Sequence, residues 1–317
     1  MDIDYQQRFI VSFPVSAEYE MESEAAAARA TTKDGASSTI PTHLHQTWKT
    51  RAVHPVFQRF YDSWSRYHPT WTRQIWSDED NRNLVATEFP ELLTFYDELP
   101  HFILKVDIVR YLILYARGGV YADMDVESLK SMDDLLVPGT RVLLGFELYD
   151  PEFIIEISIM GAVPGQSLFL KVVREAVIAE GIAAGDAAGD AAGDAAGDVS
   201  EDMHTVGADT VKSAAGNGNK PTKLSVYNIT GNRVFTRVVR QELLGNSSSS
   251  SGIQVLAQNL FYPGYPLRYE TRNEHRCRCG PVAPVIGYPC HACKKMYPDS
   301  YTIHHETGTW VYSWERR

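Results

Sequence analysis

The stretch from Lys105 to Asp125, KVDIVRYLILYARGGVYADMD, combines three structural signals in one short run. Its first half repeats apolar residues at helical spacing, which predicts an amphipathic helix: Ile108, Leu112 and Tyr115. Gly118 and Gly119 then end this helix, because glycine tolerates the left-handed backbone that closes one. The next three residues read as a short buried strand, after which Asp123 and Asp125 stand one residue apart. The stretch therefore predicts a helix, a tight turn and a strand that ends in two carboxylates.

Two carboxylates this close repel one another unless a cation or several hydrogen-bond donors compensate them. Oxygen ligands of this kind suit Mg²⁺ or Mn²⁺, which complete their coordination with water and substrate phosphates. Such a metal would act as a Lewis acid on a departing nucleoside diphosphate. A DxD without supporting residues more often begins a solvated loop, so the neighbouring residues decide between a metal site and a loop. Asp107 and Arg110 lie one turn apart on one face of the predicted helix. They form either a surface ion pair or an acceptor and a donor for sugar hydroxyls and phosphate.

The order of these residues resembles the DXD-containing sugar-transferase region of glycosyltransferase family 32. That family includes the fungal initiating α-mannosyltransferases and the inositol-phosphoceramide mannosyltransferases. The matching residues are Asp107, Arg110, Tyr111, Gly118, Gly119, Tyr121, Asp123 and Asp125. The resemblance implies a single GT-A-like α/β domain, with a Rossmann-like mixed, mostly parallel sheet flanked by helices. It also implies a nucleotide-sugar donor and a divalent metal held by the two aspartates of the DxD.

The run from Ile40 to Lys49, IPTHLHQTWK, resembles the first strand of the same family. The resemblance implies that Gln46 and Trp48 lie beside the nucleotide base, since an aromatic face suits a flat heterocycle. A core position for Trp48 is an equal alternative, and for His45 a structural role is favoured. Strands and helices alternate after this run, as in a parallel sheet whose ligands bind beyond the carboxyl ends of the strands.

The closing run YTIHHETGTW resembles the C-terminal segment with which the family returns to its donor site. The resemblance implies that His304 and His305 complete the metal site and that Thr309 and Trp310 bind the diphosphate. A pair of histidines near a C-terminus is otherwise usually solvated surface.

The resemblance assigns a role to each donor-side residue. Asp123 and Asp125 hold the metal, and Arg110 and Thr309 bind phosphate. Asp107 orients the donor sugar, and Tyr121 belongs to the donor-binding set.

Three positions elsewhere carry weaker signals. Glu147 ends a predicted strand, either near the acceptor sugar or as an edge carboxylate in water. Asp78 follows Trp76-Ser77 and either touches the nucleotide or caps the next helix. The family usually has Thr-Gly-Pro where this chain has Asn232 after Thr230 and Gly231, which weakens any substrate role for that turn. A strand is predicted over 255–262.

Composition narrows the class of protein. The 317 residues are 44% hydrophobic and 22% charged, as in a soluble globular protein with a sizeable core. The net charge of −10 argues against a general nucleic-acid binder and against polybasic membrane attraction. No run approaches the roughly 18 apolar residues of a membrane span. The N-terminus lacks signal-peptide features, so we expect a cytoplasmic protein, or a Golgi-lumenal one if an anchor is missing from this chain.

The chain divides unevenly. Residues 1–37 form an acidic, alanine-rich leader that we expect to be flexible, and 38–317 form the transferase domain. Two insertions interrupt it: 181–220, which contains four copies of AAGD and is expected to be disordered, and 270–298. The second insertion holds all four cysteines: Cys277, Cys279, Cys290 and Cys293. Their spacing favours a structural zinc site, with two disulfides as the alternative in an oxidising compartment.

The sequence thus predicts a retaining, metal-dependent glycosyltransferase, an expectation that rests on the resemblance. It would move a hexose from GDP-mannose, or alternatively from a UDP-hexose, to a hydroxyl of a glycan, a glycolipid or a protein. The alternative function is a non-catalytic interaction protein with a transferase-like fold and an arm stapled by zinc or by disulfides.

Overall fold

The computed structural model describes residues 39–149, 152–189, 226, 228–245, 252–263, 295 and 297–305. The predicted leader, most of the AAGD-rich insertion and the four cysteines lie outside these residues. Their predicted structures therefore stay predictions.

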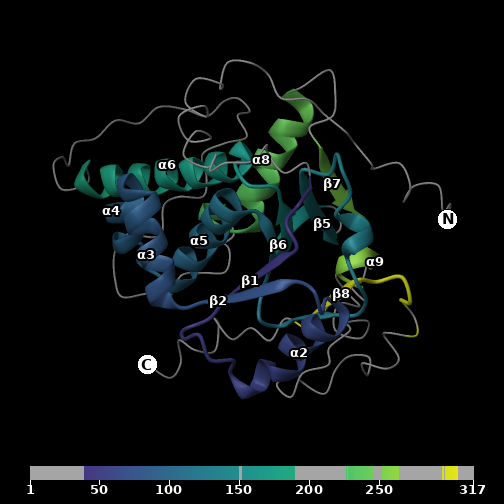
Figure 1. Ribbon diagram of the computed structural model, residues 1–317. Helices are drawn as coiled ribbons and strands as arrows, with labels where there is room; N and C mark the ends of the chain where they lie inside the picture. The colour runs from purple at the N-terminus through teal and green to yellow at the C-terminus, as the bar shows by residue number, and fades with distance from the viewer. Residues whose placement is uncertain are drawn as a thin grey trace.

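The described residues form a six-stranded central sheet with the order β2-β1-β3-β6-β5-β7 (Figure 1). The strands are β1 (His43–Thr47), β2 (Thr72–Trp76), β3 (Gly119–Ala122), β5 (Val142–Tyr149), β6 (Glu152–Ala162) and β7 (Ile253–Leu256). Strand β1 runs parallel to β2 and β3, and β5 runs parallel to β7. Strand β6 is antiparallel to both β3 and β5. The predicted GT-A-like class, with a mixed and mostly parallel sheet, is confirmed.

Helices cover both faces of this sheet, as Figure 1 shows. One apolar cluster joins it to α3 (Asp78–Glu88), α5 (Phe102–Arg117), α6 (Ser167–Gly189) and α8 (Asn232–Gly245). A second cluster joins the other face to α2 (Gln58–Tyr67) and α9 (Gln258–Phe261). Alternate residues of β3 divide between the two, with Tyr121 in the first and Val120 and Ala122 in the second. This alternation is expected of a strand buried on both faces.

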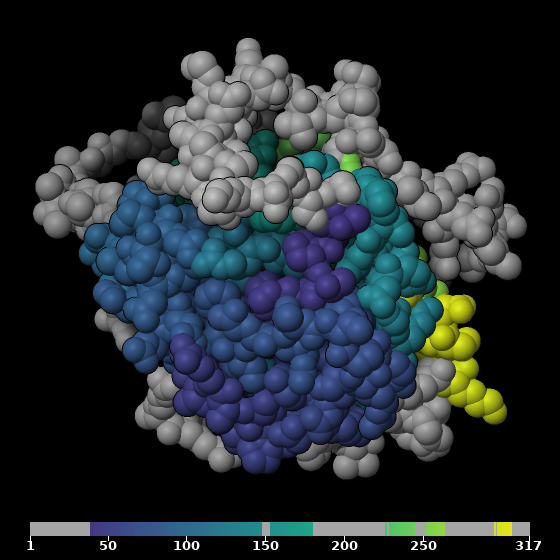
Figure 2. All heavy atoms as spheres, viewed as in Figure 1, coloured from purple at the N-terminus to yellow at the C-terminus, as the bar shows by residue number. Residues whose placement is uncertain are grey.

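Shorter elements complete the fold. A 3₁₀ turn (Pro55–Phe57) precedes α2, and another (Pro90–Leu92) leads into α4 (Leu93–Glu98). A further 3₁₀ turn spans Asp133–Leu135. A second, two-stranded sheet pairs β4 (Val126–Ser128) with β8 (Thr302–His304). Figure 2 shows the segment that contains β8, drawn yellow, at the edge of the face in view. Of the helices that the structure describes, none has the length and apolar character that crossing a lipid bilayer demands.

The predicted double-glycine turn links α5 to β3. Gly118 and Gly119 have φ values of 63° and 87°. A Cβ on Gly118 would lie 2.6 Å from the side chain of Pro164, and one on Gly119 would lie 2.5 Å from the carbonyl oxygen of His43. Both positions therefore need glycine for its positive φ and for the close approach of neighbouring chain.

Strand β6 is irregular next to the end of β3. Leu143 of β5 pairs with Gly161, but Gly145 pairs with Glu156, so two steps along β5 correspond to five along β6. Within these extra residues, the carbonyl of Ser158 accepts the backbone N–H of Asp123 at 2.8 Å. Such irregularities bend a strand and redirect its groups. Here the irregularity fixes the backbone of the first aspartate of the DxD.

Two expectations differ from the structure. The strand predicted over 255–262 is wrong in its second half, because β7 ends at Leu256 and α9 follows. There, the N–H of Tyr262 bonds to the carbonyl of Gln258 within its own turn instead of to a neighbouring strand. Helix α6 continues to Gly189, so residues 181–189 of the stretch expected to be disordered are helical. Alanine has the highest helix propensity, which favours this extension.

Candidate active site

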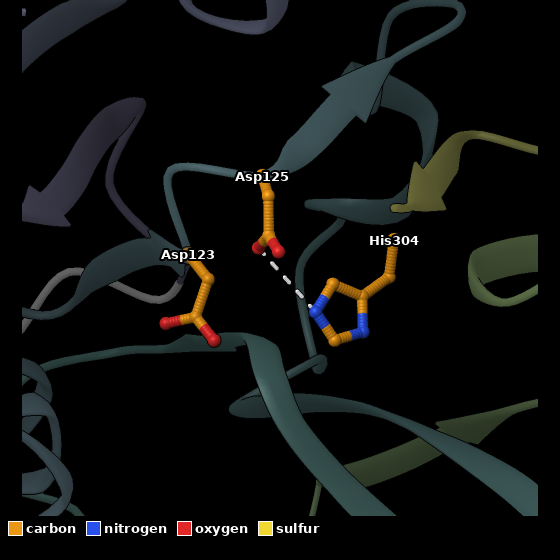
Figure 3. A group of neighbouring side chains, drawn as sticks. All are labelled: Asp123, Asp125 and His304. Carbon is orange, nitrogen blue, oxygen red and sulfur yellow. Dashed lines mark ion pairs between the residues drawn. The ribbon is translucent and has the colours of Figure 1, made fainter. Parts of the chain in front are cut away.

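Two aspartates and one histidine meet where β3 ends (Figure 3). Asp123 follows β3, Asp125 precedes β4, and His304 is the last residue of β8. One possible ligand atom from each lies within 4.8 Å of the others. Their side chains are 27%, 12% and 16% exposed, so an ion can reach them from solvent. We call these three residues the metal group.

Strand pairing places His304 in this group. The register of the antiparallel pair sets Val126 opposite His304, directly after Asp125. The N–H of His305 extends the pairing by donating to the carbonyl of Asp125 at 3.0 Å. The tail therefore returns to the DxD, as the resemblance implies, over residues 302–305.

His305 lies apart from the metal group. Its Nε2 is 3.0 Å from Oε2 of Glu127, and its ring stacks on Phe60 with a centroid distance of 4.2 Å. It is only 2% exposed. Side chains of successive residues along an extended segment point in opposite directions, so only one of two adjacent histidines can face the aspartates. This geometry contradicts the prediction of His305 as a metal ligand.

The donor set and its electrostatics fit a divalent cation. Burial raises the pKa of Asp123, and the guanidinium of Arg110 limits the shift. Burial alone would lower the pKa of His304, but Asp125 and the other nearby carboxylates raise it above its ordinary value of 6.5. The site therefore stabilises positive charge. Two carboxylates and an imidazole are acceptable ligands for Mn²⁺ and, with less preference for the imidazole, for Mg²⁺.

Three side chains hold Asp123 in place. The hydroxyl of Tyr121 donates to Oδ1 of Asp123 at 2.8 Å, and Nη1 of Arg110 lies 3.4 Å from the same oxygen. Nε2 of Gln46 donates to the backbone carbonyl of Asp123 at 3.4 Å. The aspartate therefore has a fixed orientation before any ion binds.

A buried network lies beneath Arg110. Its Nη2 is 3.0 Å from Oδ1 of Asp107, and its Nη1 donates to the carbonyl of Ile157 at 3.0 Å. Oδ2 of Asp107 accepts the hydroxyl of Thr230 at 2.8 Å. Burial raises the pKa of Asp107 to about 6, against the opposing effect of Arg110. The network ties α5, the turn before α8 and the DxD together.

This network changes the roles predicted for two residues. Arg110 is 4% exposed and bonded within the protein, so it orients Asp123 instead of facing a phosphate. The physical reason is that α5 is buried at the face that carries Asp107 and Arg110. Orientation of the donor sugar by Asp107 stays a prediction. Thr230, whose role the missing proline had weakened, holds Asp107.

The two residues predicted beside the nucleotide base lie at the end of β1. Gln46 is buried with its amide on the DxD backbone. Trp48 is half-buried and packs edge-on against Phe57 at 4.9 Å between ring centroids, in a cluster with Met124 of the DxD. Trp48 thus packs against Met124 of the DxD segment, and its contact with a base stays a prediction.

Two other candidates lie outside the metal group, and the cap suggested for Asp78 is made by Ser77. His45 lies 3.0 Å from the carbonyl of Gly118 and accepts the indole N–H of Trp76 at 3.1 Å. Burial lowers its pKa to about 3, and the favoured structural role is confirmed. Ser77 caps α3 through a capping box with Asp80, and Asp78 is the first helical residue.

Two glutamates of the central sheet, one on β5 and one on β6, are buried. Glu147 is 1% exposed, so its description as an edge carboxylate in water is wrong. Glu156 is 8% exposed and accepts a hydrogen bond from Nδ2 of Asn232 at 2.7 Å. Sequence reasoning missed Glu156. A lone carboxylate inside the apolar run FIIEISIM could have drawn attention to it. Some predicted site residues lie outside the described part of the chain: Thr309, Trp310, Cys277, Cys279, Cys290 and Cys293.

Comparisons with known proteins find similarity in the part of the chain that contains the DxD. Residues 55–142 match the family model described as a glycosyltransferase sugar-binding region containing a DXD motif. The chain is 41% identical to inositol phosphoceramide mannosyltransferase 3 of Schizosaccharomyces pombe over 100 residues, which is 32% of this chain and 28% of that protein. It is 32% identical to an initiation-specific α-1,6-mannosyltransferase of Candida albicans over 114 residues, 34% of this chain and 30% of that protein.

The matched part spans less than a third of the length of either relative. Among solved structures, PaToxG glycosyltransferase aligns with a TM-score of 0.43 at 15% identity, covering 65% of this chain and 71% of that one. The family match extends through α5, the double-glycine turn and both aspartates of the metal group. Residues 55–142 of this chain therefore resemble the glycosyltransferase sugar-binding region that contains a DXD motif.

Proposed function

We propose that this chain transfers a hexose from a nucleotide sugar to a hydroxyl acceptor, with retention of configuration and in a metal-dependent reaction. The observation that carries the proposal is the metal group: Asp123, Asp125 and His304, with ligand atoms within 4.8 Å of one another at the carboxyl end of β3. Ligands of such sheets bind beyond the carboxyl ends of the strands.

In this proposal the residues of the site bind and orient the donor. Asp123, Asp125 and His304 hold a Mn²⁺ or Mg²⁺ ion, which supplies Lewis-acid stabilisation of the departing diphosphate. Arg110 and Tyr121 keep Asp123 in its orientation through the bonds described above.

Bond changes in the proposed transfer balance within donor and acceptor. The bond between the anomeric carbon and the phosphate oxygen breaks, and its electron pair leaves with the diphosphate. The acceptor hydroxyl attacks the anomeric carbon from the same face and gives its proton to the departing phosphate oxygen. Retention rests on the family resemblance.

Mannose is the first sugar we propose, because the curated relatives named above are mannosyltransferases. GDP-mannose is then the donor, and UDP-hexoses are the alternatives. The proposed acceptor is a hydroxyl of a glycan, a glycolipid or a protein.

A donor screen tests the proposal. Release of nucleoside diphosphate is followed from GDP-mannose and from UDP-hexoses, with and without Mn²⁺, in the presence of glycan and glycolipid acceptors. We expect release with one donor, dependent on the metal and absent from a protein with both Asp123→Asn and Asp125→Asn. Equal release from the double variant would show that the metal group is not the active site.

A further inference from the structure

Glu156 is a buried carboxylate that no role described so far explains. It lies in the irregular part of β6, two residues before Ser158, whose carbonyl binds the backbone of Asp123. It is 8% exposed. A carboxylate that is removed from water must be compensated by hydrogen-bond donors or by charge.

Within the described residues, one hydrogen-bond donor contacts this carboxylate: the side-chain amide of Asn232 at the start of α8, 2.7 Å from Oε1. Asn232 is itself 8% exposed. A neutral amide compensates a carboxylate less than a guanidinium does. Within the described residues, Oε2 of Glu156 is left to accept from another donor.

Glu156 is within electrostatic reach of the metal group. Among its charged neighbours, His304 has the largest electrostatic effect on Glu156, followed by Asp123 and then Arg110. In the proposed function the donor hexose is carried by a diphosphate at the metal group. Its hydroxyl groups are donors of the kind that a carboxylate with a free oxygen binds.

Asp107 provides the contrast. Both of its oxygens are bonded inside the protein, Oδ1 to Arg110 and Oδ2 to Thr230. Glu156 has a similar depth of burial but only the amide of Asn232 as a described hydrogen-bond partner. Of the two buried carboxylates, Glu156 therefore has the greater capacity to accept hydrogen bonds from a ligand.

We propose that Glu156, positioned by Asn232, binds hydroxyl groups of the donor hexose and so sets the preference for the sugar. This inference rests on the proposed function, because it requires a nucleotide sugar at the metal group. Asn232 stands where the resembling family usually has proline, which has no side-chain donor. The pair of Asn232 with Glu156 is thus a feature by which this chain departs from that pattern.

Binding measurements isolate the sugar. Calorimetric titration with Mn²⁺ present compares the nucleoside diphosphate with the corresponding nucleotide sugar, using GDP with GDP-mannose and UDP with UDP-hexoses. The ratio of the two affinities in the parent protein measures what the sugar contributes. In Glu156→Gln we expect this ratio to fall about five- to tenfold, because hydrogen bonds to a charged group are stronger than those to a neutral one. The affinities for Mn²⁺ and for the nucleoside diphosphate should stay within about twofold of the parent.

A second variant and a control complete the test. Asn232→Ala should lower the same ratio, by less, since it loosens Glu156 without removing the carboxylate. Glu88→Gln removes a carboxylate from the exposed ion pair with Arg117 and should change no affinity. If Glu156→Gln does not unfold cooperatively on heating, the variant is not properly folded, and the inference is tested with Asn232→Ala instead.

The outcomes separate this inference from the proposed function. A parent protein that binds no nucleoside diphosphate with Mn²⁺ contradicts both. In a second outcome, the parent protein binds the nucleotide sugar and the nucleoside diphosphate with different affinities, and Glu156→Gln and Asn232→Ala keep the same ratio of affinities. This outcome overturns the inference and leaves the proposed function standing. An equal fall in affinity for the diphosphate and the nucleotide sugar also overturns it, because Glu156 would then act on the diphosphate site.

Discussion

The metal group is held from two sides in different ways. On one side, Asp123 rests on the buried network of Tyr121, Arg110 and Asp107, inside the main apolar core. On the other side, His304 comes from β8, a strand of three residues that pairs only with β4 among the described strands. One support is part of the core, and the other is a short strand pairing supplemented by the contacts of His305 with Glu127 and Phe60.

This difference separates what keeps the fold from what completes the site. Short two-stranded pairings are marginal by themselves, whereas a buried charged network is costly to break. We therefore expect changes in the buried network of Tyr121, Arg110 and Asp107 to affect both stability and function. Changes on the His304 side should affect metal binding with little change in stability.

The largest effect should come from the DxD itself. Asp123→Asn and Asp125→Asn should each lower turnover by about a thousandfold, because a Lewis acid contributes several kcal/mol to such a transition state. Each should leave the melting temperature nearly unchanged, since loss of one carboxylate relieves repulsion in the metal-free protein. Turnover with saturating Mn²⁺ and thermal unfolding measure the two effects. Parent-level turnover in either variant would contradict the assignment.

Breaking the core support should cost stability. Arg110→Met removes the cation from between Asp107 and Asp123, and we expect a loss of about 3–5 kcal/mol in the free energy of unfolding. Arg82→Met is the control, since Arg82 forms an exposed ion pair with Asp97 and should cost under about 1 kcal/mol. Denaturant unfolding of both variants compares them. Equal costs would mean that the buried network does not stabilise the fold.

The tail side can be tested through its pH dependence. The pKa of His304 is raised in the metal-free protein by the nearby carboxylates, so the imidazole keeps its proton to a higher pH than usual, and a metal must displace that proton. The affinity for Mn²⁺ should therefore rise with pH, by up to about tenfold per unit, and level off above the pKa of His304. His304→Gln should bind Mn²⁺ at least about tenfold more weakly at high pH and with a flatter pH profile. Identical profiles for parent and variant would remove His304 from the metal group.

The smallest effect should come from the anchor of the tail. Glu127 lies 3.0 Å from both Nε2 of His305 and Nη2 of Arg59. Glu127→Gln should weaken Mn²⁺ binding about two- to tenfold, as expected for one hydrogen bond of this kind, because β8 is held less firmly. Glu175→Gln, in the exposed pair with Arg237, is the control. If the Glu127 variant loses stability but no metal affinity, the anchor serves the fold alone.

The sequence by itself determined the local structure of the segment from α5 to the DxD. Helix, double-glycine turn, strand and aspartates are adjacent in the chain, and each is specified by local rules of periodicity and backbone conformation. The close approach of Gly118 to Pro164 and of Gly119 to His43 is a further requirement for glycine at these positions, and it comes from the tertiary structure. The position of Asp123 and Asp125 at the carboxyl end of a strand follows directly.

Only the tertiary structure decided which polar residues face the site. The pairing of β4 with β8 selects His304 over His305, because adjacent residues of an extended segment point in opposite directions. Burial of α5 turns Arg110 from an expected phosphate ligand into a support for Asp123. The irregular part of β6 contains both Glu156 and Ser158, whose carbonyl binds the backbone of Asp123. Each choice depends on contacts between segments far apart in the chain, and a residue's type and spacing do not fix the direction in which its side chain points.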